Sequence, residues 1–446
     1  MQYRLKKKFK LNGVQILALG FLLLILVGAT LLSLPISSKN GEYTNFLDAM
    51  FTSTSAVCVT GLITLNTSTH WSIFGQTVIM TLIEIGGLGF MSFAVLISLI
   101  LGKKITLRER LVMQEAMNTY SIQGLVKMVK YVLAFTVSVE FFGALLLSTQ
   151  FVPEYGASKG AFYSIFHSIS AFCNAGFDLF GTSLVNFSDN SVVILVISTL
   201  IIIGGLGFTV LLEIYEFKGM KKLSLHSKLV LIATGILIFG GAILMLLFEY
   251  KNPDTIGAMN IKDKLLNSFF ASVSPRTAGF NSVSTSDMTL ASKFLTIILM
   301  LIGGSPGSTA GGLKTVTCSI LVLTVISVIK GREDTEVFGR RFTKEIVYKA
   351  FTIVFIGLSL VIGVTMILSY TEVGASFIDL LYESASALGT VGLTLGLTPE
   401  LSSIGKILIM IMMYLGRVGP LTVMLALTRK KKKSGYKYPE GKILIG

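Results

Sequence analysis

The chain has 446 residues, of which 52% are hydrophobic and 14% are charged. Because a soluble domain carries about a quarter charged residues, this composition excludes a soluble protein and predicts an all-α integral membrane protein. The formal net charge of +14 would suit nucleic acid, but the positions of the basic residues, given below, favour a membrane surface instead.

The first predicted element is an apolar run at residues 14–34, which is long enough to cross a bilayer as a helix. It follows a basic tail, 1–13, and is too long for a secretory signal peptide. Residues 43–57 are moderately apolar and too short to cross, and they lead into a loop at Gly61. Residues 72–101 then cross back. One unit is therefore an outer helix, a half-helix with a loop, and an inner helix.

The same outline recurs three more times along the chain. Outer helices are expected near residues 127–150, 226–248 and 346–369, half-helices near 158–172, 262–274 and 375–388, and inner helices near 190–217, 291–329 and 403–427. The chain thus divides into four repeats and a C-terminal tail, at residues 14–101, 122–217, 225–329, 344–427 and 428–446. Since each repeat crosses twice, we expect eight transmembrane helices in a pseudo-fourfold arrangement around one central ion pore.

Each predicted half-helix ends in the same short stretch, Ser-x-Ser followed by a small or apolar run and then by one Gly with Leu or Phe. The four glycines are Gly61, Gly176, Gly279 and Gly392. Irregular backbone cannot face lipid, so four such loops predict a water-filled pore. Glycine allows backbone angles that turn carbonyl oxygens toward an ion, and the C-terminal end of a half-helix favours a cation. The alternative is that these glycines only permit tight turns or close packing.

The expected selectivity filter consists of each glycine with the two residues before it. These are Val59, Thr60, Gly61, Asn174, Ala175, Gly176, Thr277, Ala278, Gly279, Thr390, Val391 and Gly392. The loops carry no Asp or Glu, so selection must rest on carbonyl oxygens, which favours a dehydrated monovalent cation over calcium. A calcium or non-selective channel stays open as an alternative, and acidic groups at the filter mouth would signal it.

The third inner helix contains a glycine-rich interruption that cannot remain a regular helix. Its residues are Gly303, Gly304, Ser305, Pro306, Gly307, Ser308, Thr309, Ala310, Gly311, Gly312 and Lys314. No strand precedes this stretch, and its Lys is one position late for a phosphate-binding loop. A break in mid-membrane must line the pore, so we expect loop 303–314 to be a gate beneath the filter.

The fourth inner helix carries Arg417 where the first two copies have Gly-Gly-Leu-Gly-Phe. An Arg inside a membrane is expensive and is a functional candidate by default, here at the gate. It is expected to pair either with Glu84 or with carbonyls of the gate loop, or to limit cation flow by its charge. A purely structural ion pair is the alternative. The role of Glu84 is left open. The Gly-Gly-Leu-Gly-Phe stretches favour close helix packing over dinucleotide binding.

Most basic residues, 28 of the 38 Lys and Arg, fall in five segments. These are residues 1–10, 102–130, 218–228, 330–349 and 428–446. This positive-inside pattern places both termini in the cytoplasm and favours contact with anionic lipid over nucleic acid. The three Cys and three His show no metal-binding or disulfide spacing. We therefore expect a transporter or channel rather than an enzyme.

Four helix–half-helix–helix units with one filter glycine each, the glycine-rich break and Arg417 resemble the Trk/Ktr/HKT superfamily of potassium transporters, and most of all the KtrB-type membrane subunits of bacterial Ktr systems. The resemblance implies potassium uptake at the bacterial plasma membrane. A glycine in all four filter loops resembles the potassium-selective kind. A sodium-permeant or sodium-coupled transporter of the same architecture is the alternative.

The resemblance also implies partners. Members of this family form homodimers, and Ktr membrane subunits dock on a cytosolic octameric ring of KtrA-like RCK subunits. The expected ATP or ADP would bind to that ring and not to this chain. No covalent cofactor is expected, and K⁺ is the transported ion, bound at the filter. The resemblance also matches loop 303–312 and Arg417 to the gate of the family.

Overall fold

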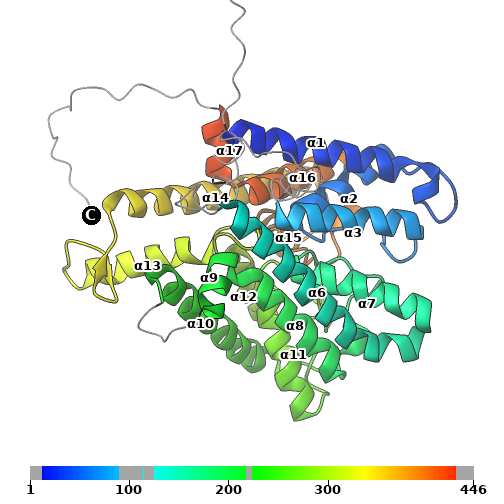
Figure 1. Ribbon diagram of the computed structural model, residues 1–446, viewed down its shortest axis with the longest axis horizontal. Helices are drawn as coiled ribbons and strands as arrows, with labels where there is room; N and C mark the ends of the chain where they lie inside the picture. Colours follow the sequence, from blue (N-terminus) through cyan, green and yellow to red (C-terminus); the bar gives the residue numbers. More distant parts are fainter. Residues whose placement is uncertain (1–12, 90–113, 115–124, 217–222, 428–446) are drawn as a thin grey trace, which may run out of the picture.

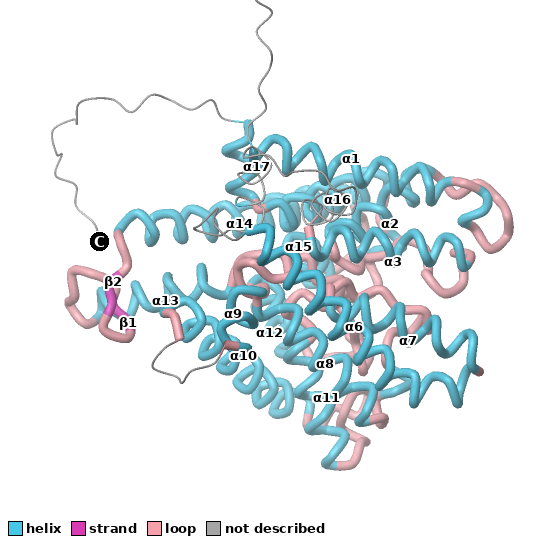
Figure 2. The backbone as a smooth tube through the Cα atoms, viewed as in Figure 1, coloured by secondary structure: helices cyan, strands magenta, loops and turns pink. Residues whose placement is uncertain are grey.

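The computed structural model describes residues 13–89, 114, 125–216 and 223–427. Within these residues the regular secondary structure is helical apart from one two-stranded hairpin (Figure 1). Figure 2 shows that non-helical backbone lies not only at the ends of the molecule but also between the helices in its middle. Of the expected tails, 1–13 and 428–446, all but Gly13 lies outside the described residues, and Gly13 begins the first helix.

The first part of the chain forms α1 (Gly13–Ser33), the short helix η1 (Pro35–Ser37), α2 (Phe46–Cys58) and α3 (Ile73–Leu88). The Asn45 side chain accepts the N–H of Leu47 at the start of α2, and Ser72 accepts the N–H of Gly75 at the start of α3. Such N-caps satisfy N–H groups that have no partner within the helix. The three helices match the expected outer helix, half-helix and inner helix, and residues 90–101 of the last lie outside the described residues.

The second part forms α6 (Leu125–Tyr155), α7 (Ala157–Phe172), η2 (Val185–Phe187), α8 (Ser191–Leu206) and α9 (Phe208–Tyr215). The expectation of one continuous inner helix at 190–217 is wrong. The chain bends by 101° between α8 and α9. The bend lies at Gly207, whose φ of 91° falls in the left-handed region that a side chain disfavours.

The third part forms α10 (Leu225–Glu249), α11 (Ile261–Val273), α12 (Leu290–Leu301) and α13 (Thr315–Ile329). The break between α12 and α13 falls where the glycine-rich stretch predicted it. The hairpin follows, with β1 (Glu336–Val337) antiparallel to β2 (Arg340–Arg341) and Glu336 opposite Arg341.

The fourth part forms α14 (Lys344–Thr371), α15 (Phe377–Gly389), η4 (Thr398–Glu400), α16 (Ser403–Val418) and α17 (Pro420–Leu427). The expected continuous inner helix at 403–427 is also wrong. It is divided at Gly419, whose φ is 93°, and Pro420 begins the second piece. Pro is favoured in the first turn of a helix because its missing N–H needs no partner there.

Four described helices are long and apolar enough to cross a membrane. They are Gln15–Ser33, Val126–Tyr155, Leu225–Glu249 and Lys344–Thr371, which correspond to the four expected outer helices. The bent pair of α8 and α9 adds a fifth span if it is counted as one. The described parts of the other inner helices are shorter. Breaks separate α12 from α13 and α16 from α17, and residues 90–101 of the first inner helix lie outside the described residues.

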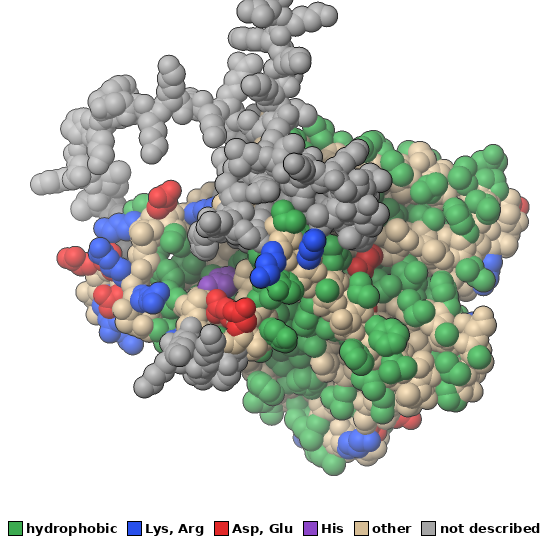
Figure 3. All heavy atoms as spheres, in the orientation of Figure 1, with side chains coloured by type: hydrophobic (Ala, Val, Ile, Leu, Met, Phe, Trp, Pro, Cys, Tyr) green, Lys and Arg blue, Asp and Glu red, His purple; other side chains and the backbone are tan. Residues whose placement is uncertain are grey.

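The outer surface is largely apolar, as a lipid-facing surface must be. Figure 3 shows hydrophobic side chains spread over the face formed by α3, α6 and α8, whereas charged side chains gather at the end that carries the hairpin. Phe141, Phe142 and Phe239 are 64%, 62% and 66% exposed. The half-helices α2, α7, α11 and α15 lie inside, with their C-terminal halves buried.

Candidate functional site

The four glycine loops share one backbone conformation. In each, the glycine and the residue two places before it have positive φ. The glycines are Gly61 (96°), Gly176 (71°), Gly279 (79°) and Gly392 (93°), and the residues before them are Val59 (57°), Asn174 (61°), Thr277 (76°) and Thr390 (50°). Positive φ is uncommon for residues with a side chain, and rarest for β-branched ones. Four loops of different sequence are thus held in the same unusual shape, including the third, which is one residue shorter.

The loops meet in a closed ring. Each glycine faces the carbonyl oxygen of the residue before the next glycine in chain order: Gly61 faces Ala175, Gly176 faces Ala278, Gly279 faces Val391, and Gly392 faces Thr60. A Cβ atom built on these glycines would lie 2.5, 2.7, 2.2 and 2.1 Å from that oxygen. A side chain therefore cannot enter at any of the four positions without moving backbone.

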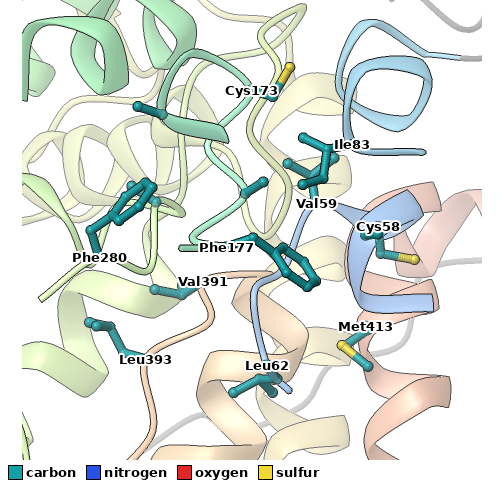
Figure 4. Packing of buried hydrophobic residues seen from close by; sticks show 14 of the residues in the cluster. Cys58, Val59, Leu62, Ile83, Cys173, Phe177, Phe280, Val391, Leu393 and Met413 are labelled. Atoms are coloured by element: carbon teal, nitrogen blue, oxygen red, sulfur yellow. The ribbon is translucent and has the colours of Figure 1, made fainter. Parts of the chain in front are cut away.

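Apolar side chains of the loops surround the ring. Figure 4 shows Val59, Phe177, Phe280 and Val391, one from each loop, gathered in one region with Cys58 and Cys173 at its edge. All of these residues belong to the same buried cluster. The Asn174 amide and the Thr277 hydroxyl lie 3.2 Å apart and link the second loop to the third. The remaining expected filter residues, Thr60, Ala175 and Ala278, are also fully buried.

The second serine of each Ser-x-Ser motif closes its loop. Its hydroxyl either accepts the N–H of the glycine or donates to the carbonyl of the residue after it. The pairs are Ser55 with Gly61 (3.0 Å), Ser170 with Phe177 (2.8 Å), Ser274 with Phe280, and Ser386 with Gly392 (3.1 Å). The repeated serine thus has a structural reason that the sequence pattern did not reveal.

The first serine ties the half-helix to the outer helix of the same repeat in three of the four copies. The hydroxyl donates to a backbone carbonyl at Ser53–Ile25 (2.7 Å), Ser168–Glu140 (2.7 Å) and Ser272–Ile238 (2.8 Å). Three residues after each of these carbonyls stands a glycine, Gly28, Gly143 or Gly241, where a Cβ atom would lie within 2.5 Å of the serine oxygen. Within the described residues the fourth hydroxyl, that of Ser384, has no partner.

Two side chains directly before these first serines brace the chain after the ring. The Nε2 atom of His167 accepts the N–H of Leu179 (3.3 Å). The carboxylate of Glu383 accepts the hydroxyls of Thr394 (2.8 Å) and Thr398 (2.5 Å). Both residues stand directly before the first serine of their motif, and each holds the segment that follows the glycine of its own loop.

A cavity of about 430 Å³ opens on one side of the ring. All four ring glycines line it, together with the residues two places after them: Ile63, Asp178, Asn281 and Thr394. We call this cavity the vestibule. The twelve expected filter residues carry no acid, but Asp178 brings a carboxylate to the mouth of the ring. Sequence reasoning missed this residue because it considered each loop only up to its glycine and the Leu or Phe after it.

The interrupting loop, 303–314, lies directly against the ring. A Cβ atom on Gly311 would lie 2.1 Å from the hydroxyl of Thr390, and one on Gly303 would lie 3.2 Å from the methyl of Thr277. The loop is closed at its base by the Gly303 N–H, which donates to the Leu313 carbonyl (2.7 Å).

Backbone hydrogen bonds fasten the loop to the second and fourth inner helices. The N–H groups of Ser305, Thr309 and Gly312 donate to the carbonyls of Gly205, Gly204 and Gly416, and the N–H of Phe208 donates to the carbonyl of Gly307, at 2.9 to 3.2 Å. Within the loop, Ser308 donates to the Ser305 carbonyl (2.6 Å) and Lys314 to the Ala310 carbonyl (2.6 Å). The Pro306 carbonyl lies against Gly207, where a Cβ would be 2.8 Å away.

Arg417 joins this loop to the first inner helix through carbonyl groups. Its guanidinium donates to the Thr309 carbonyl of the loop and to the carbonyls of Gly86 and Gly87. Of the two expected pairings, the gate-loop carbonyls are therefore correct and Glu84 is not. Glu84 instead accepts from the thiol of Cys173 (3.4 Å).

One glycine in each of three inner helices packs closely on a half-helix, as the sequence indicated for the two Gly-Gly-Leu-Gly-Phe stretches. A Cβ atom on Gly86, Gly204 or Gly416 would lie about 2 Å from a carbonyl oxygen near the end of the half-helix, at Val57 (2.1 Å), Phe172 (1.9 Å) or Leu388 (2.1 Å). These three glycines therefore let the first, second and fourth inner helices touch the backbone of their half-helices directly beneath the ring.

Comparison with known proteins gives a family and a fold. Residues 10–436 match the sequence model of the family described as TrkH, cation transport protein. The chain is 48% identical to the potassium/sodium uptake protein NtpJ of Enterococcus hirae, over 100% of this chain and 99% of the relative. It is 45% identical to the Ktr system potassium uptake protein B of Bacillus subtilis, over 97% of this chain and 96% of the relative.

Among solved structures, the potassium transporter TrkH from Vibrio parahaemolyticus is similar to this chain with a TM-score of 0.74. The match covers 96% of this chain and 87% of the other, at 20% sequence identity. At this level of identity the likeness is one of fold, and it agrees with an all-helical membrane protein of several apolar spans.

Proposed function

Since the chain belongs to the TrkH family of cation transport proteins, we propose that it takes up potassium across the bacterial plasma membrane through the ring of glycine loops. Its family makes it a multi-pass membrane transporter and not an enzyme. The single observation that carries the proposal is the ring itself: four loops in one strained conformation, each glycine packed on the carbonyl of the next.

The chemistry of the ring suits a dehydrated monovalent cation. The twelve residues of the proposed filter, from Val59 to Gly61 and at the three matching positions, offer backbone carbonyls and no carboxylate. Carbonyl oxygens can replace the water shell of K⁺. The half-helices end at the ring, and the partial negative charge at their C-terminal ends adds to the attraction for a cation.

The architecture that we propose around the ring is pseudo-fourfold, with eight membrane crossings and one central pore. Repeats at 14–101, 122–217, 225–329 and 344–427 each supply an outer helix, a half-helix, a glycine loop and an inner helix. The recurrence of the second-serine bond in every loop supports this division. The proposed orientation has both termini in the cytoplasm, which the positions of the basic segments support.

Loop 303–314 with Arg417 is the proposed gate. The loop lies against Thr277 and Thr390 of the ring, on the side of the inner-helix double glycines, and backbone bonds and the guanidinium hold it there. Because glycine permits many backbone angles, this loop can rearrange at modest cost once those bonds are released. The proposed closed state is the one in which Arg417 bridges Thr309 to Gly86 and Gly87.

A cytosolic partner is part of the proposal. One relative is named as a component of a Ktr system, and the resemblance of the chain to Ktr membrane subunits implies an octameric KtrA-like RCK ring that binds ATP or ADP. We place its contact at the cytoplasmic loops and the gate of a homodimer. The chain itself needs no cofactor under this proposal.

A second candidate is a sodium-permeant or sodium-coupled transporter of the same architecture. It is favoured by one observation: NtpJ, 48% identical to this chain, is named a potassium/sodium uptake protein. A glycine in all four loops, rather than a bulkier residue, supports potassium as the main ion.

The proposal is tested by flux of K⁺ and Na⁺ into liposomes that hold the purified full chain, beside a variant that lacks residues 305–310. We expect K⁺ flux to exceed Na⁺ flux in both proteins and to be larger in the variant, because the proposed gate is shortened. Absence of flux for either ion in both folded proteins would contradict the pore. Equal flux in the two proteins would contradict the gate.

A further inference from the structure

We propose that Asp178 is a cation-recruiting residue of the vestibule, which sets the affinity for external K⁺ without taking part in selection between ions. This inference rests on the proposed function, because it assumes that ions pass through the ring. It concerns a residue outside the proposed filter and the proposed gate.

Asp178 differs in charge from the residues at the matching positions of the other three loops. The four residues two places after the ring glycines all line the vestibule, and three of them are uncharged: Ile63, Asn281 and Thr394. Among the described residues that line this cavity, Asp178 is the one with a charged side chain. Each loop therefore lines the cavity at the same two positions, but among the described residues the second loop alone brings a negative charge there.

Backbone hydrogen bonds hold the carboxylate of Asp178. Its Oδ1 atom accepts the N–H groups of Phe180 (2.9 Å) and Gly181 (2.6 Å). The carbonyl of Gly181 in turn accepts from the Asn66 side chain (3.3 Å), which follows the first glycine loop. The turn that carries Asp178 is thus tied to the segment after the first glycine loop, and the bonds from Phe180 and Gly181 hold the carboxylate on this turn.

The negative charge of Asp178 acts on cations in the vestibule. A negative charge in a cavity with low-dielectric walls raises the local concentration of cations and their rate of entry. One carboxylate is too few to form a calcium site, which takes six to eight oxygen ligands with several charges. Asp178 can therefore raise the occupancy of the vestibule by K⁺ without trapping a divalent ion there.

Asp178→Asn is the variant that isolates this charge. The Asn side chain keeps an acceptor oxygen for the N–H groups of Phe180 and Gly181, so the turn is retained while the charge is lost. The matched control is Asp254→Asn, which removes the same charge from an exposed side chain that does not line the vestibule.

The measurement is K⁺ influx into liposomes against external K⁺ concentration. Because burial raises the pKa of Asp178, the flux is measured at about pH 8, well above the usual range of a carboxyl group. N-methylglucamine chloride, an impermeant salt, sets the ionic strength. At low ionic strength we expect the half-saturating K⁺ concentration of Asp178→Asn to rise at least about threefold. The maximal flux and the K⁺/Na⁺ ratio should not change, and the rise should shrink at high ionic strength because salt screens the charge. Asp254→Asn should behave as wild type.

A charge-relocation variant separates charge from structure. In Asp178→Asn with Asn281→Asp, the carboxylate returns to the vestibule from the third loop, and we expect the half-saturating concentration to fall back toward the wild-type value. An unchanged half-saturating concentration in Asp178→Asn, with normal wild-type flux, would overturn this inference alone. So would a loss of maximal flux without a change in half-saturation, which would indicate a structural role. Absence of K⁺ flux in the wild type would overturn the proposed function itself.

Discussion

The ring of glycine loops and the layer directly beneath it differ in how far the four repeats agree. At the ring, all four copies have positive φ at the same two positions, a hydrogen bond between the second serine and the glycine or the residue after it, and the same glycine-to-carbonyl contact. In the layer beneath, the third copy supplies a loop and the fourth supplies Arg417, while the first and second supply carbonyl acceptors. A small cation needs oxygens from every side, whereas a passage can be closed from one side. The ring is therefore alike in all four repeats because it is proposed to bind the ion, whereas the layer beneath differs between repeats because it is proposed only to close the passage.

The largest expected effect comes from breaking the symmetry of the ring itself. Gly392→Ala places a Cβ atom 2.1 Å from the Thr60 carbonyl oxygen, at a φ of 93°. The loop must then move or adopt a strained conformation, and strain of this kind is worth about 1–3 kcal/mol. We expect K⁺ flux in liposomes to fall at least about tenfold.

The matched control is Gly235→Ala in the outer helix α10, where nothing lies within 4 Å of the added atom. It should retain wild-type flux. Gel filtration in detergent checks that both variants are folded. Wild-type flux in a folded Gly392→Ala protein would show that the ring tolerates displacement. The close contact between Gly392 and the Thr60 carbonyl would then not be needed for ion flux.

An intermediate effect is expected at Arg417, in the layer beneath the ring. Arg417→Gln removes the charge that joins Thr309 to Gly86 and Gly87. Hydrogen bonds to a charged donor contribute about 1.5–3 kcal/mol each, so losing one of them shifts the balance between closed and open gate by about tenfold or more. We expect a corresponding rise in K⁺ flux, measured in liposomes without any partner.

Arg417→Lys sharpens this test, because it keeps the charge but has fewer donors in a different geometry. Its flux should lie between wild type and Arg417→Gln. If Arg417→Gln folds and its flux equals that of wild type or falls below it, the guanidinium does not hold the gate closed.

The smallest expected effect concerns the hydrogen bond from the first serine of the motif to the outer helix, which the fourth repeat lacks in the part of the chain that the structure describes. Ser168→Ala removes a buried hydrogen bond to the Glu140 carbonyl, and it should lower stability by about 0.5–1.5 kcal/mol. Ser384 has no such partner within the described residues. Ser384→Ala should therefore leave the apparent Tm in detergent unchanged while Ser168→Ala lowers it. Equal shifts in the two variants would mean that the bond to the outer helix does not stabilise the half-helix.

The comparison of the two regions also explains what could be predicted from the sequence. The half-helices were expected within about three residues of their observed bounds, because each combines a short apolar run with the Ser-x-Ser motif and a glycine. The break at 303–314 was expected because five glycines and Pro306 cannot form a regular helix. The breaks at Gly207 and Gly419 were missed, since glycine and proline are both tolerated within membrane helices.

Contacts between distant segments could not be predicted in the same way. The partners of Arg417 are backbone carbonyls, which every residue has, so the sequence does not distinguish them from Glu84. The bracing roles of His167 and Glu383 depend on where the chain runs after the ring. Asp178 was missed because its importance comes from the vestibule, and a cavity is not visible in the spacing of a motif.

The K⁺/Na⁺ flux ratio of Gly279→Ser beside wild type, in liposomes that hold the full chain, tests the central claim most directly. Gly279 has a φ of 79°, and a Cβ atom there would lie 2.2 Å from the Val391 carbonyl oxygen. If the ring selects potassium through its carbonyls, wild type should prefer K⁺ and the folded variant should lose much of that preference. An unaltered ratio in the variant would contradict selection by this ring.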